Sequence, residues 1–361
     1  MRLYKRPMTI DPRNPPYNAD GTGATDATAA LNVAISAAVN TTDIDISYGS
    51  FLVAGTLIVN GPLAMHGSNE HRSTLLVPDP TVDLMHLTTP APVHLEKFTI
   101  RSQTKGGQTA GAMIKSVQAA GVGNTESTFR TIRMIGAYDG FDLTGCSWWK
   151  MIDCYVNGFA NRAVVVANPA RVDAGDSVID RLTSLKSEHG GTHVWQASSG
   201  GLRVQNSKMI GADYGYQLDL AAGAGTSTLL INGNSMEGQR LSGIYMDHEP
   251  GSTFENVVIN GNEFESQNTP IEIASKDNVV WCRCIAISGN SIYLAPTGGI
   301  AMQINGAAFG SVTGNAIFQN GGTTYGVYLD TQANDWHAGP NEMTGITNPY
   351  VDLGVGNIIT L

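Results

Sequence analysis

The sequence is poor in charge, in cysteine and in long apolar runs, and each shortage excludes a class of protein. Charged residues make up 14% of the 361 residues, against roughly a quarter in an average soluble domain. The net charge is −10 and no basic block occurs, which argues against nucleic-acid binding and disfavours a polyanionic ligand. No stretch is apolar enough to span a membrane and no signal peptide is visible, so we expect no membrane insertion.

Only four cysteines occur, and they give no sign of disulfides or of a metal site. Cys282 and Cys284 alternate along one expected strand, so both thiols face the same side in a geometry that is poor for pairing. Zinc ligands are missing nearby. We interpret these two, with Cys146 and Cys154, as small apolar core residues in a reducing compartment, and we expect no metal and no cofactor.

The sequence is rich in glycine, with 42 residues, and it repeats one short phrase. Residues 231–234 read Ile-Asn-Gly-Asn, and related phrases stand at 259–262, 287–290 and 312–315, with final asparagines 28, 28 and 25 residues apart. Such a period is typical of a solenoid, in which each coil buries its apolar face only against the next. Gly can take the left-handed turn conformation, and stacked Asn side chains are expected to hydrogen-bond along the axis.

A second strand follows each phrase, and the last five of these strands align into columns. Two columns are apolar throughout: Leu218, Met246, Ile273, Met302 and Leu329, and two residues earlier Tyr216, Ile244, Ile271, Ile300 and Val327. Because side chains alternate along a strand, we expect both columns to face the interior. The alternate columns are mixed and polar and should face outward: Gln217, Tyr245, Glu272, Ala301 and Tyr328, and Asp219, Asp247, Ala274, Gln303 and Asp330.

Coils of about 22–29 residues with two or three short strands predict an all-β chain folded as a single parallel β-helix. By the same alignment Trp195 falls in the inward column of Leu218. One helix is predicted, over 26–39, with Thr25 or Asp26 as its cap. Its apolar side, Leu31, Ala34, Ile35 and Ala38, is suited to covering the open first coil.

Two segments near the N-terminus carry a resemblance to a known family. Residues 20–31, Asp-Gly-Thr-Gly-Ala-Thr-Asp-Ala-Thr-Ala-Ala-Leu, and 48–53, Tyr-Gly-Ser-Phe-Leu-Val, resemble the opening motif of pectate-lyase-like right-handed β-helices. Within that superfamily the sequence is most similar to bacteriophage tailspikes and capsule depolymerases. It departs from the pattern at Ala27, where the family often has a second Asp, and at Tyr48, where it often has Pro. The resemblance covers roughly residues 17–361.

The resemblance implies a right-handed parallel β-helix domain over 19–361 and a virion protein of the phage tail, made in the host cytoplasm. It implies a homotrimer, although the sequence itself shows no trimer signal. Residues 1–18 would be the virion-attachment segment that joins phage tail or adaptor proteins, and a disordered terminus is the open alternative. The fold hosts lyases, hydrolases, isomerases and pure binders, so the resemblance leaves the reaction open.

Paired carboxylates are what cleavage of a polysaccharide needs, and the outward columns supply them. Asp219 and Asp247 are expected one coil apart in one column, with Glu272 one coil further in the neighbouring column. Tyr245 and Gln217 share that second column and, with His248 in the next turn, are predicted to bind substrate. The alternative is an exposed acidic rim that water screens.

Other groups offer weaker candidates. Glu237 and Glu265, with Glu263 beside them, form a second carboxylate pair on another face or edge. Glu188, His189 and His193 form a third cluster, better read as a satisfied loop histidine. Trp148 and Trp149 are candidate sugar platforms, and because they are adjacent one should point outward.

The sequence therefore predicts a tailspike for host adsorption that binds and cleaves bacterial surface polysaccharide, lipopolysaccharide O-antigen or capsule, as a glycoside hydrolase. A polysaccharide lyase is the second choice, with Arg203, Lys208 or Arg240 as the basic residue. A receptor-binding spike without enzymatic activity is the remaining alternative.

Overall fold

The computed structural model describes residues 9–361, apart from 41, 118–124, 168–175, 187, 189, 198, 199, 276–281 and 323. The side chains of residues 248, 254, 266, 275 and 282 also lie outside the described part. Residues 1–8 of the expected attachment segment 1–18 therefore fall outside it as well. The chain divides into two compact units, Met1–Val165 and Val166–Leu361.

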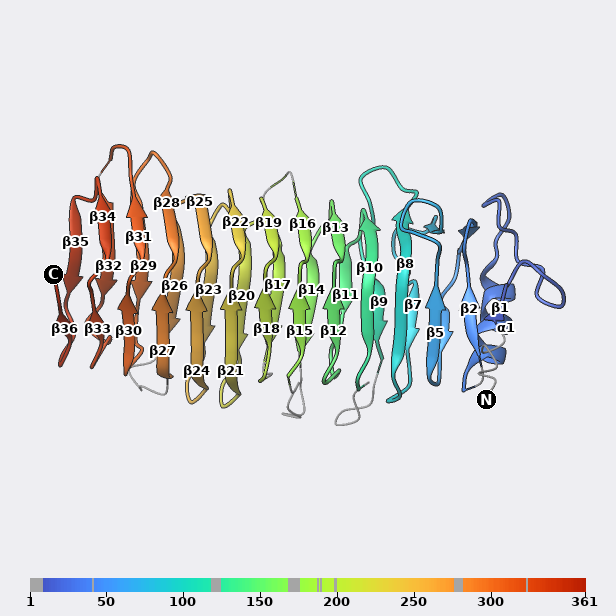
Figure 1. Cartoon of the computed structure of the whole chain (residues 1–361), viewed down its shortest axis with the longest axis horizontal. Helices are drawn as coiled ribbons and strands as arrows, with labels where there is room; N and C mark the ends of the chain where they lie inside the picture. The colour runs from blue at the N-terminus through green and yellow to red at the C-terminus, as the bar shows by residue number, and fades with distance from the viewer. Residues whose placement is uncertain are drawn as a thin grey trace, which may run out of the picture. The chain divides into compact units, whose positions relative to one another are not determined.

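The fold is a right-handed parallel β-solenoid of about ten turns, as the sequence predicts, with one short helix among the described residues (Figure 1). The first unit contains β1 (Thr9–Ile10), α1 (Thr28–Ala38), β2 (Asp43–Asp45), β3 (Ser50–Leu52), β4 (Leu57–Val59), β5 (Leu63–His66), β6 (Thr74–Val77), β7 (Met85–Leu87), β8 (Val93–Ser102), β9 (Ala112–Ser116), β10 (Thr128–Ile135), β11 (Asp139–Asp142), β12 (Lys150–Ile152), β13 (Tyr155–Asn157) and the start of β14 (Arg162–Ala167).

The second unit continues with shorter and longer strands in turn. They are β15 (Val178–Asp180), β16 (Thr183–Leu185), β17 (Thr192–Ala197), β18 (Arg203–Gln205), β19 (Lys208–Ile210), β20 (Tyr214–Leu220), β21 (Gly225–Asn232), β22 (Ser235–Glu237), β23 (Ser242–His248), β24 (Thr253–Asn260), β25 (Glu263–Gln267), β26 (Thr269–Ser275), β27 (Cys282–Ser288), β28 (Ser291–Leu294), β29 (Gly299–Ile304), β30 (Gly310–Thr313), β31 (Ala316–Phe318), β32 (Thr324–Leu329), β33 (His337–Ala338), β34 (Glu342–Thr344), β35 (Asn348–Asp352) and β36 (Ile358–Ile359).

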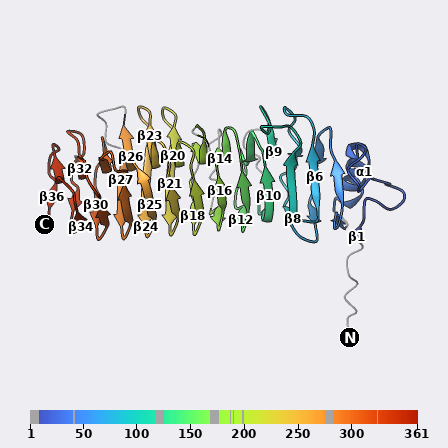
Figure 2. The same ribbon diagram turned by 90° about the horizontal axis from the view of Figure 1, so that it is seen from above.

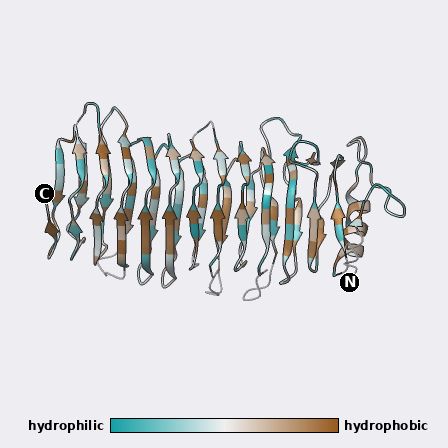
Figure 3. Ribbon diagram, in the orientation of Figure 1, coloured by the Kyte–Doolittle hydropathy of each residue, from teal (hydrophilic) through white to brown (hydrophobic). Residues whose placement is uncertain are grey.

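In the second unit each strand pairs in parallel with its counterpart one coil later, which builds three ribbons. The first ribbon is β15–β18–β21–β24–β27–β30–β33–β36. The second ribbon is β16–β19–β22–β25–β28–β31–β34. The third ribbon is β17–β20–β23–β26–β29–β32–β35. Apolar and polar residues share the same strands (Figure 3), as alternation between core and surface requires.

The helix α1 closes the first coil. It begins at Thr28 and ends at Ala38, slightly inside the predicted range, and buries the predicted Leu31, Ala34, Ile35 and Ala38. Figure 2 shows α1 at the N-terminal end of the first unit. Asp26 accepts a hydrogen bond from the Thr28 amide at 3.0 Å. Asn32 faces the free edge of β4, where its amide donates to the Thr56 carbonyl at 2.9 Å and its oxygen accepts from the Ile58 N–H at 2.8 Å. The helix therefore satisfies backbone groups that a solenoid edge leaves unpaired.

The core columns of the third ribbon agree with the prediction over β20, β23 and β26. Tyr216 pairs with Ile244 and Leu218 with Met246, and all four are buried. The prediction is wrong at β29, where Ile271 pairs with Met302 and Ile273 with Ile304. A shift of two residues keeps the same side chains inward, so the alternating pattern could not reveal it. Gln303 therefore stands opposite Glu272, and Ala301, predicted to face outward, is buried.

Trp195 is also placed differently from the prediction. It pairs with Gln217 in the outward column, and Gln196 occupies the inward column of Leu218. The buried Gln196 is hydrogen-bonded inside the core, because its amide oxygen accepts from the Tyr216 hydroxyl and its nitrogen donates to Thr226 Oγ1. A polar residue with such partners can replace an apolar one in the interior. The pattern of apolar residues therefore does not predict the register of this strand.

A ladder of asparagines joins the turns between the first and second ribbons, as the repeated phrase predicts. Asn Nδ2 donates to the Asn Oδ1 one coil later at 2.9–3.0 Å, through Asn234, Asn262, Asn290, Asn315 and Asn341. The same Nδ2 groups also donate to backbone carbonyls of the preceding coil, as Asn262 does to Ile231 at 2.9 Å. The glycine before each of the first four asparagines has a φ of 63–66°, which favours glycine.

Replacement of a central ladder residue should destabilise the second unit. In Asn262→Ala the buried Asn234 backbone N–H, one N–H of the Asn234 side chain and the Ile231 carbonyl each lose the hydrogen bond that Asn262 supplies, at a cost of about 3 kcal/mol in the free energy of unfolding. Denaturant unfolding at pH 7 measures it. The matched control is Asn260→Ala, because Asn260 is exposed and its side chain donates, within the described residues, to Ser288 Oγ alone at 3.2 Å. Equal losses in the two variants would contradict the role of the ladder.

His193 lies in the core of β17 and not in a loop. Its Nε2–H donates to the Gly211 carbonyl at 3.1 Å, so Nδ1 accepts from Ser184 Oγ at 2.7 Å. Burial is the main reason that the pKa of His193 is lowered to about 4; the hydrogen bond to the Gly211 carbonyl opposes this effect and the charge of Lys186 adds to it. His189 lies outside the described residues and Glu188 is exposed, so the predicted third cluster reduces to a buried, neutral histidine.

The neutral His193 makes stability depend on pH. The unfolded chain binds a proton near pH 6.5 and the folded chain only near pH 4, so stability is full above pH 6.5 and falls as the pH drops toward 4. The loss amounts to about 3 kcal/mol. We expect His193→Gln to flatten this dependence in denaturant unfolding between pH 7 and 4, whereas the exposed His337→Gln leaves it unchanged. An unaltered slope in His193→Gln would refute the assignment.

Candidate functional site

The outward side chains of β17, β20, β23 and β26 bring half of the predicted site residues together. Asp219 pairs directly with Asp247, and Tyr245 lies between Gln217 and Glu272 in the neighbouring column. We refer to Trp195, Tyr214, Gln217, Asp219, Ser242, Tyr245, Asp247 and Glu272 as the third-ribbon cluster. All of its members belong to the second unit. His248 continues β23, but its side chain lies outside the described residues.

Neutral donors hold the carboxylate of Asp219. Gln217 Nε2 donates to both of its oxygens at 3.0 and 3.1 Å, and Trp195 Nε1 donates to Oδ2. The oxygen of the Gln217 amide accepts from Thr192 Oγ1 at 2.6 Å, which fixes the orientation of the amide. Gln217, predicted to bind substrate, is thus engaged in positioning Asp219, and Asp219 is oriented as an acceptor.

The environment of Glu272 differs from that of the carboxylates of Asp219 and Asp247. It is half-buried, and Ser242 Oγ donates to its Oε2 at 3.0 Å. Burial raises the pKa of the Glu272 carboxyl, the Ser242 hydroxyl partly offsets this, and the charge of Asp247 raises it again. A carboxyl group whose pKa is raised beside an ionised one is the arrangement that general acid catalysis uses.

Two tyrosines give the cluster an aromatic surface. The rings of Tyr214 and Tyr245 lie 5.2 Å apart between centroids. Burial raises the pKa of the Tyr214 hydroxyl, and the nearby Glu272 adds to the effect. The sequence did not single out Tyr214, because strict alternation from Tyr216 places it inward. The buried Gly215 between them interrupts that alternation and is the only signal that marks the position.

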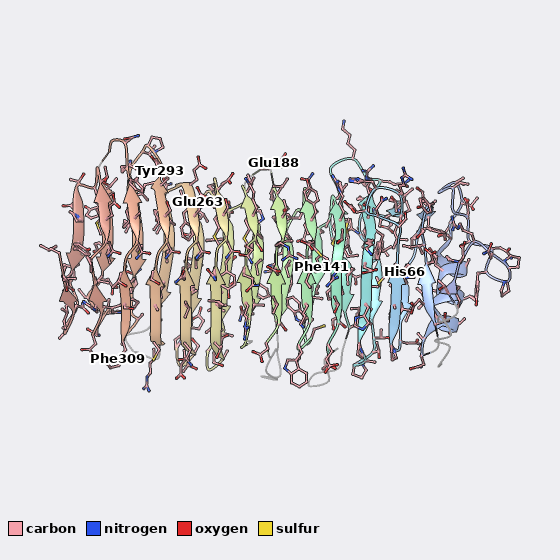
Figure 4. All side chains as sticks on the ribbon, in the orientation of Figure 1. His66, Phe141, Glu188, Glu263, Tyr293 and Phe309 are labelled. Carbon is pink, nitrogen blue, oxygen red and sulfur yellow. The ribbon has the colours of Figure 1, made fainter. Side chains whose placement is uncertain are left out.

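The second predicted pair lies elsewhere in the second unit. Glu237 and Glu265 pair across β22 and β25 in the second ribbon, as the sequence places them. Lys208 Nζ lies 2.8 Å from Glu237 Oε1 and, as the main cause, lowers the pKa of that carboxyl. Tyr293, which pairs with Glu265, stacks on Phe318 with 5.5 Å between ring centroids. Figure 4 labels Tyr293 and Glu263 on this ribbon. A carboxylate held ionised by a lysine is poorly suited to donate a proton.

The tryptophan pair divides between core and surface. Trp149 is fully buried, so the prediction that it binds substrate is wrong; its ring fills the core of the first unit. Trp148 is 54% exposed at a turn with φ of 54°. It belongs to the first unit and stays a separate candidate surface.

The basic residues considered for a lyase are all engaged. Arg240 binds Asp213 at 2.7 Å, Lys208 binds Glu237 at 2.8 Å, and Arg203 lies 3.6 Å from Asp176. Within the described ranges, no three His, Cys, Asp or Glu side chains are grouped to hold a metal ion. The described part of the chain also contains no helix with the length and hydrophobicity needed to traverse a lipid bilayer.

Comparison with known proteins finds likeness in structure and not in sequence. No protein-family model and no curated protein matches the chain. The A-module of mannuronan C-5 epimerase AlgE6 from Azotobacter vinelandii superposes with a TM-score of 0.68 at 14% identity, over 98% of this chain and 99% of that one. Pre-mature bacteriophage phi29 gene product 12 gives 0.61 at 12% identity, over 98% of this chain and 57% of that one.

The catalytic unit of a thermostable GH87 alpha-1,3-glucanase from Streptomyces thermodiastaticus gives a TM-score of 0.51 at 14% identity, over 97% of this chain and 68% of that one. At such identities a structural likeness shows a shared architecture and leaves the activity open. The chain therefore has the right-handed parallel β-helix fold.

Proposed function

We propose that the third-ribbon cluster binds a bacterial surface polysaccharide and hydrolyses it. The observation that carries the proposal is the placement of Glu272, with its raised pKa, diagonally across from Asp247 and beside the ring of Tyr245. Sugar rings stack on aromatic side chains, and their hydroxyl groups donate to carboxylates. The cluster combines both features on one face of four successive coils.

In the proposed reaction Glu272 is the general acid that protonates the glycosidic oxygen, and Asp247 is the base that activates water. Neighbouring strands are about 4.8 Å apart and two residues rise about 6.6 Å, so the two positions are separated by about 8 Å. This separation lies in the range of roughly 6.5–9.5 Å that inverting glycosidases use. Asp219, held by Trp195 and Gln217, would accept a hydrogen bond from a sugar hydroxyl next to the cleaved bond.

The biological setting is part of the proposal. Phi29 gene product 12 is a phage protein by its name, and the epimerase and the glucanase are named for polysaccharides. These likenesses support a tailspike that adsorbs to lipopolysaccharide or capsule as a depolymerase. In that setting the chain would sit in the virion as a homotrimer and would join tail or adaptor proteins through residues 1–18.

A spike that binds glycan without cutting it is the alternative that one observation favours. The three hydrogen bonds on Asp219 make it a fixed recognition group, which suits binding as well as catalysis. The lyase is the weaker alternative because its candidate bases are held by carboxylates. Release of reducing ends from the polysaccharide indicates a hydrolase, ultraviolet-absorbing unsaturated ends indicate a lyase, and binding alone indicates a spike without activity.

Removal of either catalytic carboxyl should abolish cleavage but keep binding. We expect Glu272→Gln and Asp247→Asn each to lower kcat by about 10²–10⁴-fold, measured as reducing ends released from a panel of bacterial surface polysaccharides. The product should have inverted anomeric configuration by NMR. Glu263→Gln, an exposed carboxylate of the second ribbon, is the matched control. Full activity in Glu272→Gln would rule out the proposed acid, and a retained configuration would rule out the proposed pair.

The hydroxyl of Ser242 should set the alkaline limit of activity. Because its hydrogen bond stabilises ionised Glu272, Ser242→Ala raises the pKa of Glu272 further. A general acid must be protonated, so the falling limb of the pH–rate profile should move to higher pH. Ser235→Ala removes the equivalent bond to Glu237, 2.8 Å long, and should leave the profile in place. A shift in Ser235→Ala alone would transfer the chemistry to the second ribbon.

A further inference from the structure

A groove on the first unit lies on a ribbon that the proposed hydrolase does not use. The strands β2, β5, β8 and β10 pair in parallel, and their outward side chains form two columns. One column runs Asp43, Ala64, His94, Thr128, and the other runs Asp45, His66, Glu96, Arg130. Figure 4 labels His66 on this ribbon.

The small side chain of Ala64 leaves a hollow between its larger neighbours in the column. The resulting pocket has a volume of about 270 Å³ and is lined by both columns, including Asp43, His94 and Arg130. Sites for small molecules usually measure about 300–1,000 Å³, so this pocket fits a ligand of about one sugar ring. Its walls are mixed: Ala64, Met65 and Leu95 contribute apolar surface, and the polar groups come from the outward side chains of both columns.

The charges of the groove are not neutralised by one another. Arg130 stands directly opposite Glu96 across β8 and β10, where opposite charges usually pair. Among the described residues Arg130 forms no ion pair, and Glu96 is bound by its neighbour Lys97 at 3.2 Å. The guanidinium of Arg130 therefore keeps its donors for a planar oxyanion, which it can bind with two parallel hydrogen bonds.

The remaining lining groups suit the hydroxyls of the same ligand. Neither the imidazole of His66 and His94 nor the carboxylate of Asp43 takes part in a hydrogen bond with another described side chain. Imidazole can donate or accept, and a carboxylate accepts from two hydroxyl groups. No Phe, Tyr or Trp side chain is among the lining residues, so recognition here would rest on polar contacts and on the charged side chains of Arg130, Asp43 and Glu96.

We propose that this groove binds one saccharide unit that carries an anionic group, either a carboxylate or a phosphate. Arg130 contacts the oxyanion, Asp43 and Glu96 accept from ring hydroxyls, and His66 and His94 complete the polar wall. The site is independent of the hydrolase proposed for the second unit, and either proposal can fail alone. It would give the chain a second contact with a glycan that bears acidic sugars or phosphate.

The test uses four probes on the full chain: glucuronate, glucose 6-phosphate, glucose and inorganic phosphate. Binding is followed through the imidazole resonances of His66 and His94 by NMR, so that sugars bound to the second unit are not counted. We expect at least one anionic sugar to bind about tenfold more tightly than glucose and than inorganic phosphate, a difference of about 1.4 kcal/mol. The two anionic sugars distinguish carboxylate from phosphate.

Two variants and a control separate the site from a general surface effect. Arg130→Gln should remove the advantage of the anionic sugar over glucose, and Ala64→Leu should fill the hollow and abolish binding of all the sugars. Arg101→Gln, an exposed arginine of β8 outside the groove, should bind like the parent chain. Thermal unfolding checks that each variant is folded.

Three outcomes would overturn the proposal. Equal affinity for glucose and the anionic sugars removes the role of the charge. Equal affinity for inorganic phosphate and glucose 6-phosphate, with no binding of glucuronate, shows an anion site and not a saccharide site. Perturbation of the two imidazoles that survives in Ala64→Leu places the ligand outside the groove.

Discussion

Parallel hydrogen bonding between successive coils is the constraint on which both core and surface depend. Each strand is held in register with its counterpart one coil later, so a residue type that recurs at equivalent positions of successive coils forms a column with a spacing of about 4.8 Å. Apolar residues repeated in this way become the core columns, and Asp219 and Asp247 become direct neighbours. The asparagine ladder holds the same register at the turns with side-chain hydrogen bonds, where the strands themselves are interrupted.

The two sets of stacked carboxylates in the second unit, one in the second ribbon and one in the third-ribbon cluster, accommodate their negative charge in opposite ways. In the second ribbon a lysine neutralises Glu237, and the pair forms a stable surface ion pair. In the third ribbon Asp219 is held by uncharged donors and Glu272 by a serine hydroxyl, so the negative potential of the cluster persists. Burial, with a smaller contribution from the charge of Asp247, raises the pKa of Glu272, which is why this cluster and not the other suits acid catalysis.

The sequence predicts those parts of the molecule in which a repeated residue has one physical explanation. The asparagine ladder, the buried face of α1, and the pairing of Asp219 with Asp247 follow from spacing alone. The register at β29 does not, because a slip of two residues preserves the alternation. The prediction places Trp195 inward, where the structure has Gln196, for a different reason. Side chains from later coils form hydrogen bonds with the buried amide of Gln196, which lets a polar residue occupy the core. The orientations of Tyr214 and Trp149 depend on local bends of the backbone, which the alternation of apolar and polar residues does not predict.

The contact of Asn32 with β4 has a consequence beyond the stability of the first coil. A solenoid is built by adding one strand to the open edge of the last, and an exposed edge can accept a strand from any chain. Asn32 occupies the Thr56 carbonyl and the Ile58 N–H that such a strand would use. The helix thus acts as a terminator of polymerisation, which keeps a fold made of identical stacking steps from growing end to end into fibres.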